Sequence, residues 1–165
     1  MLVTLFTDAG HCPDLHVGVW AAWAKESGQT LRRAGILIGE VPHSGEAEFK
    51  ALHNGLFLVS RVINPPAESR IICQVDSQEV LTALEKGKHP RAEMRFLAQK
   101  LLADYAEQRR WLLSFRHVKG HKGTVTPRNA VNTWCDKECK RLLGLARAEK
   151  RAVQAARCVP ALGQG

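Results

Sequence analysis

Four acidic residues, spread over most of the 165-residue chain, have the types and settings that metal chemistry requires. Asp8 follows the apolar run 2–7, and Asp76 follows a second apolar run. Glu48 and Asp136 each lie in a segment whose apolar residues recur at helical spacing. A carboxylate at the end of a buried strand is costly unless positive charge compensates it. Two such strand ends and two helical acids therefore predict a divalent-metal site, and on a basic protein they point to phosphodiester chemistry.

The composition is that of one globular domain with an anionic partner. The chain is 45% hydrophobic and 24% charged, with a formal net charge of +8, which favours nucleic acid or an anionic surface as the partner. Its five cysteines form no CxxC pair, so we expect reduced thiols in a cytoplasmic protein, with Cys135 and Cys139 facing the core, rather than a structural zinc site. No apolar run approaches the roughly 20 residues that span a bilayer. We expect no signal peptide, no membrane association and a monomer.

The apolar pattern predicts nine elements in the order β-β-β-α-β-α-α-β-α. Strands are expected over 2–7, 17–24, 31–40, 70–75 and 111–118, and helices over 46–59, 77–84, 91–109 and from 127 onward. Short connections between the first three strands imply antiparallel hairpins, whereas a strand that follows a helix runs parallel to a neighbour. We therefore predict an α/β fold in which about four helices flank a five-stranded mixed sheet. The domain is expected to cover 1–150, with a basic helix end and a flexible tail over 151–165.

The order of these elements and five short motifs closely resemble type 1 ribonuclease H from residue 2 to about residue 145. The motifs are Phe6-Thr7-Asp8, Ala47 to Leu52, Val75-Asp76-Ser77, His117 to His121, and Asn132 to Asp136. The resemblance implies the ribonuclease H-like fold. It also implies a Mg²⁺-dependent endonuclease that hydrolyses the RNA strand of RNA–DNA hybrids and leaves 5′-phosphate and 3′-hydroxyl ends. Two Mg²⁺ ions per site are implied, and Mn²⁺ is expected to substitute for them.

The resemblance gives each acid, and one histidine, a catalytic role. Asp8 would bridge both ions, Glu48 and Asp76 would hold the ion that activates the attacking water, and Asp136 would hold the ion at the leaving oxygen. His121 would shuttle protons or help to release the product. The physical chemistry agrees, because Mg²⁺ prefers hard oxygen ligands. Two ions about 3.5–4 Å apart can stabilise both oxygens of an in-line displacement.

Two of these assignments have a competing neighbour. Glu46 and Glu48 point to different faces of a helix, so only one can reach the metals. The Ala-Glu-aromatic pattern of the family selects Glu48, and Glu46 is interpreted as a favourable acid in the first helical turn. His117 lies within the last strand, where we expect it to be packed or hydrogen-bonded, whereas His121 lies in a glycine-containing loop. The loop from His121 to Asp136 is longer than is usual in the family, which leaves the resting position of His121 open.

The sequence signals for residues that contact the substrate are weaker than those for the four acids. Backbone amides near Gly10 are expected to approach the RNA strand, because glycine permits close approach. The family often carries two asparagines before the helical glutamate, and here Ser44 is their partial substitute. Ser77 is either a substrate contact or a helix N-cap, and Asn132 either contacts the substrate backbone or caps a loop. The candidate substrate-binding set is Gly10, His11, Cys12, Ser44, Ser77, Lys119, Lys122 and Asn132.

Other functions fit part of the same pattern. The altered segment before the helical glutamate would suit a nuclease of the same fold that acts on double-stranded RNA or branched DNA. A catalytically inactive hybrid-binding module would gain nothing from carboxylates that face phosphate. A proofreading exonuclease is disfavoured, because Asp8-Ala9-Gly10 lacks the second acid of an Asp-x-Glu motif. Four clustered carboxylates also predict a raised pKa for at least one of them, and stabilisation of the protein by Mg²⁺.

Overall fold

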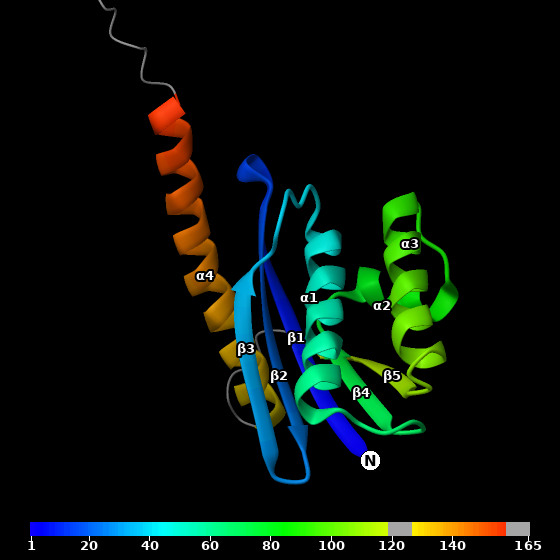
Figure 1. The fold of residues 1–165 in the computed structure, drawn as a ribbon. Helices are drawn as coiled ribbons and strands as arrows, with labels where there is room; N and C mark the ends of the chain where they lie inside the picture. Colours follow the sequence, from blue (N-terminus) through cyan, green and yellow to red (C-terminus); the bar gives the residue numbers. More distant parts are fainter. Residues whose placement is uncertain (119–126, 158–165) are drawn as a thin grey trace, which may run out of the picture.

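The structure is a computed structural model that describes residues 1–118 and 127–157. Its strands are β1 (Leu2–Cys12), β2 (Val17–Glu26), β3 (Gln29–Ile36), β4 (Arg70–Val75) and β5 (Leu112–His117). Its helices are α1 (Ser44–Leu58), α2 (Gln78–Lys86), α3 (Ala92–Leu101) and α4 (Pro127–Arg157). The predicted order of elements is confirmed (Figure 1). The predicted helix over 91–109 is divided, because the chain continues after α3 as a π-helix over Leu102–Glu107.

The five strands form one mixed sheet with the order β3-β2-β1-β4-β5. The first three strands are antiparallel, and β4 and β5 run parallel to β1, as predicted. β1 continues to Cys12 rather than ending at Thr7, because residues 8–12 pair with β2. Its pairing with β4 ends earlier, at Phe6 opposite Gln74. The two parallel strands therefore separate at this point. An acid follows two residues later in each case, Asp8 within β1 and Asp76 directly after β4.

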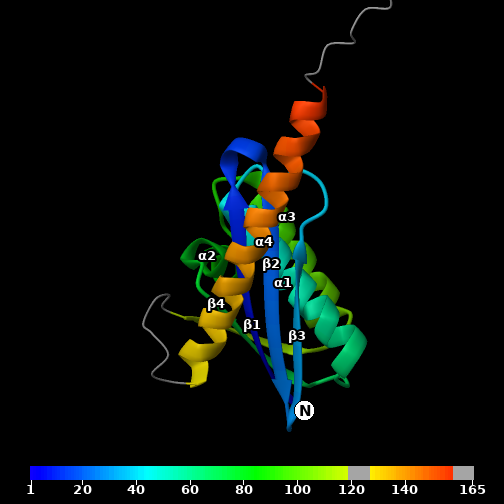
Figure 2. The same ribbon diagram turned by 90° about the vertical axis from the view of Figure 1, so that its left-hand side faces the viewer.

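Helices cover both faces of the sheet. Phe49, Leu52 and Leu56 of α1 are fully buried, and side chains of α2 and α3 belong to the same core cluster. On the opposite face α4 crosses the strands (Figure 2) and buries Cys135 and Cys139 in a second cluster with residues of β1 and β2. Both cysteines face the core, as predicted. Among the described residues, no helix combines the length and the apolar character that crossing a membrane requires.

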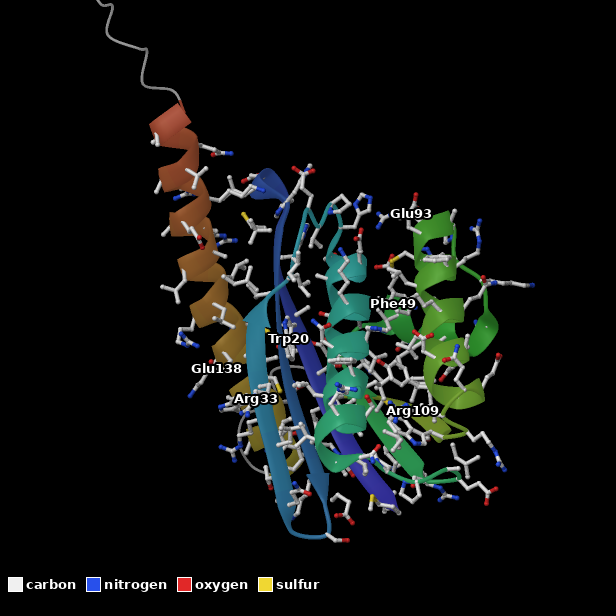
Figure 3. The ribbon with its side chains drawn as sticks, in the orientation of Figure 1. Trp20, Arg33, Phe49, Glu93, Arg109 and Glu138 are labelled. Atoms are coloured by element: carbon white, nitrogen blue, oxygen red, sulfur yellow. The ribbon has the colours of Figure 1, made fainter. Side chains whose placement is uncertain are left out.

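The third strand is shorter than predicted and ends at Ile36 instead of residue 40. Its last pairs place Gly35 beside Trp20 of β2, whose side chain lies on the α1 side of the sheet (Figure 3). Beyond Ile36 the chain turns back, because the Leu37 backbone N–H donates to the Gly18 carbonyl at 2.9 Å and Gly39 has a φ of 80°. The apolar run continues past Ile36 through Ile38, but the hydrogen-bonded pairing with β2 does not.

Gly10 lies where β1 packs closely against β2 and α4. A Cβ at this position would lie 2.8 Å from Val19 Cγ2 and 3.4 Å from the Cys139 carbonyl oxygen. The Val19 side chain is fully buried, so it has no free space into which to move. The structure thus gives this glycine a packing role in addition to the substrate approach expected from the sequence.

We expect Gly10→Ala to lower the free energy of unfolding by about 1–3 kcal/mol, because the added methyl group overpacks this contact. The measurement is denaturant unfolding of the purified protein. Gly144→Ala is the matched control, since a Cβ there meets no atom within 4 Å and alanine favours a helix. Equal stability of the two variants would contradict the packing role of Gly10.

Candidate metal centre

Three of the four predicted acids come together at the point where β1 and β4 part. Asp8 extends from β1, Asp76 directly follows β4, and Glu48 lies on α1. One carboxylate oxygen of each residue lies within 4.8 Å of those of the other two. The parallel pairing of β1 with β4 explains this arrangement, because it brings Asp8 and Asp76 to the same edge. The first turns of α1 then bring Glu48 to both of them.

Asp136, the fourth predicted acid, lies at the margin of this group. It is not one of the three acids whose oxygens are that close together. Its Oδ2 accepts a hydrogen bond from Lys140 Nζ at 2.8 Å, one turn further along α4. Its charge nevertheless acts on the group, since it contributes to raising the pKa of Asp8. The structure therefore places three acids in one cluster and the fourth beside it, held by a lysine.

The cluster is electrostatically unfavourable without a cation. Burial is the main cause that raises the pKa of Asp8, and the charge of Asp76 adds to it, so that this pKa reaches about 7. The Ala9 backbone N–H, which donates to Asp8 Oδ1 at 2.9 Å, opposes part of the rise. Burial, followed by the charges of Asp76 and Asp8, raises the pKa of Glu48 well above its ordinary value. The prediction of a raised carboxylate pKa is confirmed.

The residues present fit a divalent cation. Glu48 Oε2 is buried and has no hydrogen-bond partner among the described residues, and an oxygen in that situation costs free energy unless positive charge compensates it. The donor set consists of carboxylate oxygens from three residues. Hard oxygen donors of this kind are the ligands of Mg²⁺, which completes its coordination shell with water. The orphaned oxygen and the donor set together make this cluster a candidate metal centre.

The structure separates the two competing glutamates of α1. Glu46 forms an ion pair with Lys50 at 2.7 Å, one turn along the helix. Glu48 is the member of the cluster with Asp8 and Asp76. This arrangement agrees with the interpretation of Glu46 as an acid of the first helical turn.

Of the two candidate histidines, only His117 lies among the residues that the structure describes. His117, at the end of β5, donates a hydrogen bond from Nε2 to the Asp76 carbonyl oxygen at 3.0 Å. It is hydrogen-bonded, as predicted, but it is exposed rather than packed. This hydrogen bond restrains the backbone at Asp76, one of the three clustered acids. His121, Lys119 and Lys122 lie outside the described residues.

Some of the remaining substrate-binding candidates have side chains that are hydrogen-bonded or buried within the protein, whereas others are exposed or half-buried. The Ser77 hydroxyl accepts a hydrogen bond from the Val80 backbone N–H at 3.3 Å and caps α2, which is the N-cap alternative. His11 donates from Nε2 to the Val41 carbonyl oxygen at 2.7 Å, and the neighbouring Cys12 is buried. Ser44 is exposed at the start of α1, and Asn132 is half-buried on α4.

Two residues of α4 outside the predicted site contact its acids. Lys140 binds Asp136, and the spacing of four residues between opposite charges is a signal that could have found this pair. The Cys139 thiol donates to the Asp8 carbonyl oxygen at 3.3 Å. No local pattern marks that contact, because it depends on how α4 lies across β1.

Comparison with known proteins gives structural relatives but no sequence relatives. No protein-family model and no curated protein sequence matches the chain. Ribonuclease H1 of the halophilic archaeon Halobacterium salinarum matches with a TM-score of 0.63 at 17% identity, covering 87% of this chain and 98% of that one. The N-terminal ribonuclease H domain of a Mycobacterium tuberculosis protein matches with a TM-score of 0.59 at 20% identity, covering 90% and 97%.

A third match is a ribonuclease H1 obtained from compost by a metagenomic approach, solved in complex with an RNA/DNA hybrid. Its TM-score is 0.65 at 15% identity, and the match covers 87% of this chain and 98% of that one. Agreement over nearly the whole of each chain shows that this protein has the ribonuclease H fold. The resemblance that the sequence motifs indicate is thus confirmed at the level of the fold.

Proposed function

We propose that the protein is a metal-dependent endoribonuclease that hydrolyses the RNA strand of RNA–DNA hybrids and leaves 5′-phosphate and 3′-hydroxyl ends. The observation that carries the proposal is the cluster of Asp8, Glu48 and Asp76, whose oxygens lie within 4.8 Å of one another on the ribonuclease H fold. The net charge of +8 suits a polyanionic substrate. A structure with the same fold was solved with an RNA/DNA hybrid bound, which supports this class of substrate.

The acids are proposed to hold two Mg²⁺ ions, with Asp8 shared between them, Glu48 and Asp76 on one and Asp136 on the other. When bound, such a pair of ions supplies activation of the attacking water and stabilisation of charge on the leaving oxygen. The chain itself fixes the positions of the acids. Asp8 is held within β1 by its pairing with β2, Asp76 directly follows β4, and Lys140 restrains Asp136. His121 is retained as the proposed proton shuttle.

Discrimination between the two strands must come from outside the metal centre. A protein distinguishes RNA from DNA at a given site by contacting the 2′-hydroxyl group. Ser44 is the candidate best placed for such a contact, since it is exposed and lies four residues before Glu48 at the start of α1. Asn132 is the second candidate, on the same helix as Asp136.

The proposal is tested with four end-labelled duplexes of matched sequence: RNA–DNA, RNA–RNA, DNA–DNA, and DNA containing a single ribonucleotide. Each is incubated with Mg²⁺, Mn²⁺ or EDTA, and the products are resolved by length and by their end groups. We expect cleavage of the RNA strand of the RNA–DNA hybrid alone, in either metal, with no cleavage in EDTA. The expected products carry 5′-phosphate and 3′-hydroxyl ends.

Other results would point to the competing functions. Cleavage of RNA–RNA would retain the metal centre but make double-stranded RNA a substrate, and the specific observation that favours this is Ser44-Gly45 in place of the asparagines that the family often carries. Binding of the hybrid without cleavage in either metal would identify an inactive binding module.

A further inference from the structure

Helix α4 continues well beyond the sheet that it covers. Its 31 residues extend over about 46 Å at 1.5 Å per residue. The C-terminal end of the helix projects past the ends of the strands in both views (Figures 1 and 2), and residues 151–156 are all exposed. A helix usually gains most of its stability by packing an apolar face. Packing against this domain therefore does not account for the last turns of α4.

The projecting helix is strongly basic, and part of that charge is uncompensated. α4 contains eight Lys and Arg residues and three Asp and Glu residues, which is +5 of the net charge of +8. Lys140 and Arg141 form ion pairs with acids of the same helix. Within 1–118 and 127–157, no ion pair involves Arg147 or Arg151. The Nε of Arg147 is also buried without a hydrogen-bond partner among these residues.

The two arginines lie on the side of α4 that faces the candidate metal centre. Arg147 follows Asp136 by eleven residues, which is about three turns, so the two differ by only about 20° around the helix axis. Arg151 differs from Asp136 by about 60° on the same basis. The opposite side faces β3, because the guanidinium of Arg32 lies 5.8 Å above the ring of Trp134. Lys140, Arg147 and Arg151, which we call the α4 ridge, thus continue from the fourth acid along one side of the helix.

We propose that Arg147 and Arg151 bind phosphates of the duplex held at the metal centre, on the flank several base steps away from the scissile bond. This inference rests on the proposed function. Along the axis, the two arginines lie about 16 and 22 Å from Asp136, a span of about five to seven base steps at roughly 3.4 Å per step. Guanidinium groups bind phosphate oxygens in a bidentate fork. Contacts of this kind position a duplex without reading its sequence.

The test compares two double variants that each remove two positive charges. The first is Arg147→Gln/Arg151→Gln. The matched control is Arg110→Gln/Arg141→Gln, whose arginines are already paired with Glu68 and Glu138; Glu138 lies on the outer side of α4 (Figure 3). Binding of a 24-base-pair hybrid is measured by fluorescence anisotropy over a range of salt concentrations, with Mg²⁺ and with Asp8→Asn in all proteins to prevent cleavage.

We expect the ridge variant to bind about tenfold more weakly at low salt, and to reduce the slope of log K against log salt by about two, one for each phosphate that an arginine no longer neutralises. Arg147→Lys, which keeps the charge, should retain most of the affinity and shows that the site tolerates substitution. Shortening the hybrid to four base pairs on one flank of the metal centre should remove the difference between the Asp8→Asn parent protein and the ridge variant. Shortening the other flank should preserve it.

Two results would contradict the proposal that Arg147 and Arg151 bind phosphates of the duplex. One is equal affinity and salt slope for the ridge variant and its Asp8→Asn parent protein. The other is an equal loss of affinity in the ridge and control variants, which would reflect net charge alone. The proposed function is judged separately, by cleavage. A wild-type protein that binds hybrids through the ridge but cuts none would overturn the function, whereas unchanged binding by the ridge variant of an active enzyme would overturn only the ridge.

Discussion

Asp8→Asn is expected to abolish metal-dependent cleavage and, at the same time, to make the metal-free protein more stable at pH 8. The loss of activity should be about 10³-fold or more, because a lost metal bridge removes several kcal/mol of transition-state stabilisation. Asparagine keeps the size of the side chain but has neither the charge nor the second ligand oxygen. The assay is cleavage of the labelled RNA–DNA hybrid in saturating Mg²⁺.

The gain in stability has a separate physical cause. The rise in the pKa of Asp8 from 3.8 to about 7 means that the charged carboxylate costs the folded state as much as roughly 4 kcal/mol at pH 8. Asparagine removes that cost but leaves a buried amide that needs hydrogen-bond partners. We therefore expect a net gain of about 1–3 kcal/mol, measured by denaturant unfolding in EDTA.

Glu46→Gln is the matched control for this variant. Glu46 lies two residues from Glu48 but pairs with Lys50 outside the cluster. Removing an ion pair of this kind costs about 0.5 kcal/mol, and cleavage should remain close to that of wild type. Full activity in Asp8→Asn would show that Asp8 does not hold a metal needed for cleavage. A metal-free Asp8→Asn protein less stable than wild type would show that the carboxylates do not repel one another as their spacing indicates.

Much of the fold was predictable because its signals are local. The buried side chains Phe49, Leu52 and Leu56 recur at helical spacing, and the order of strands and helices leaves few arrangements of a mixed sheet. The end of β3 was not predictable in the same way. It depends on Leu37 hydrogen-bonding to Gly18 of the neighbouring strand and on the positive φ of Gly39. Neither feature is marked in the sequence, where the apolar run 36–38 continues past the end of the strand.

The same distinction holds at the candidate metal centre. Asp8 and Asp76 could be predicted to meet, because each follows an apolar run and parallel strands bring such ends to one edge. The position of Asp136 outside the group of three could not, because it depends on how α4 lies across β1. The same packing of α4 on β1 brings the Cys139 thiol to the Asp8 carbonyl oxygen. Sequence spacing identifies the acids, whereas packing determines which of them lie closest together.

The metal-free protein is expected to lose stability as the pH rises from about 4 to 8. The pKa of Asp8 is about 7 in the folded protein, above its ordinary value of 3.8. Between these values the folded state binds more protons than the unfolded state, so the free energy of unfolding falls with increasing pH. The raised pKa of Glu48 acts in the same direction. The loss assigned to Asp8 is at most about 4 kcal/mol and should be complete above pH 7.

Mg²⁺ is expected to reverse this loss, and to do so more strongly at high pH. A metal ion binds the charged cluster and must displace its protons, so its affinity rises as the carboxylates ionise. At a hundred times the dissociation constant it would stabilise the protein by about 2.7 kcal/mol. The increase in melting temperature on adding Mg²⁺ should therefore be larger at pH 8 than at pH 5.5. Asp8→Asn should show a smaller increase at both pH values.

The two measurements test different parts of the cluster. If wild type and Asp8→Asn have the same pH profile of stability in EDTA, Asp8 titrates as an ordinary surface carboxylate and is not buried beside Asp76. If Mg²⁺ stabilises both proteins equally at both pH values, the ion binds somewhere else on the protein. If stability falls with pH and Mg²⁺ does not restore it, the acids are buried as described but Mg²⁺ is not the ion that they bind. Mn²⁺ is then the first ion to test. If Mg²⁺ stabilises only the wild type, and most strongly at pH 8, then the carboxylates that repel one another and the bound ion are at the same site.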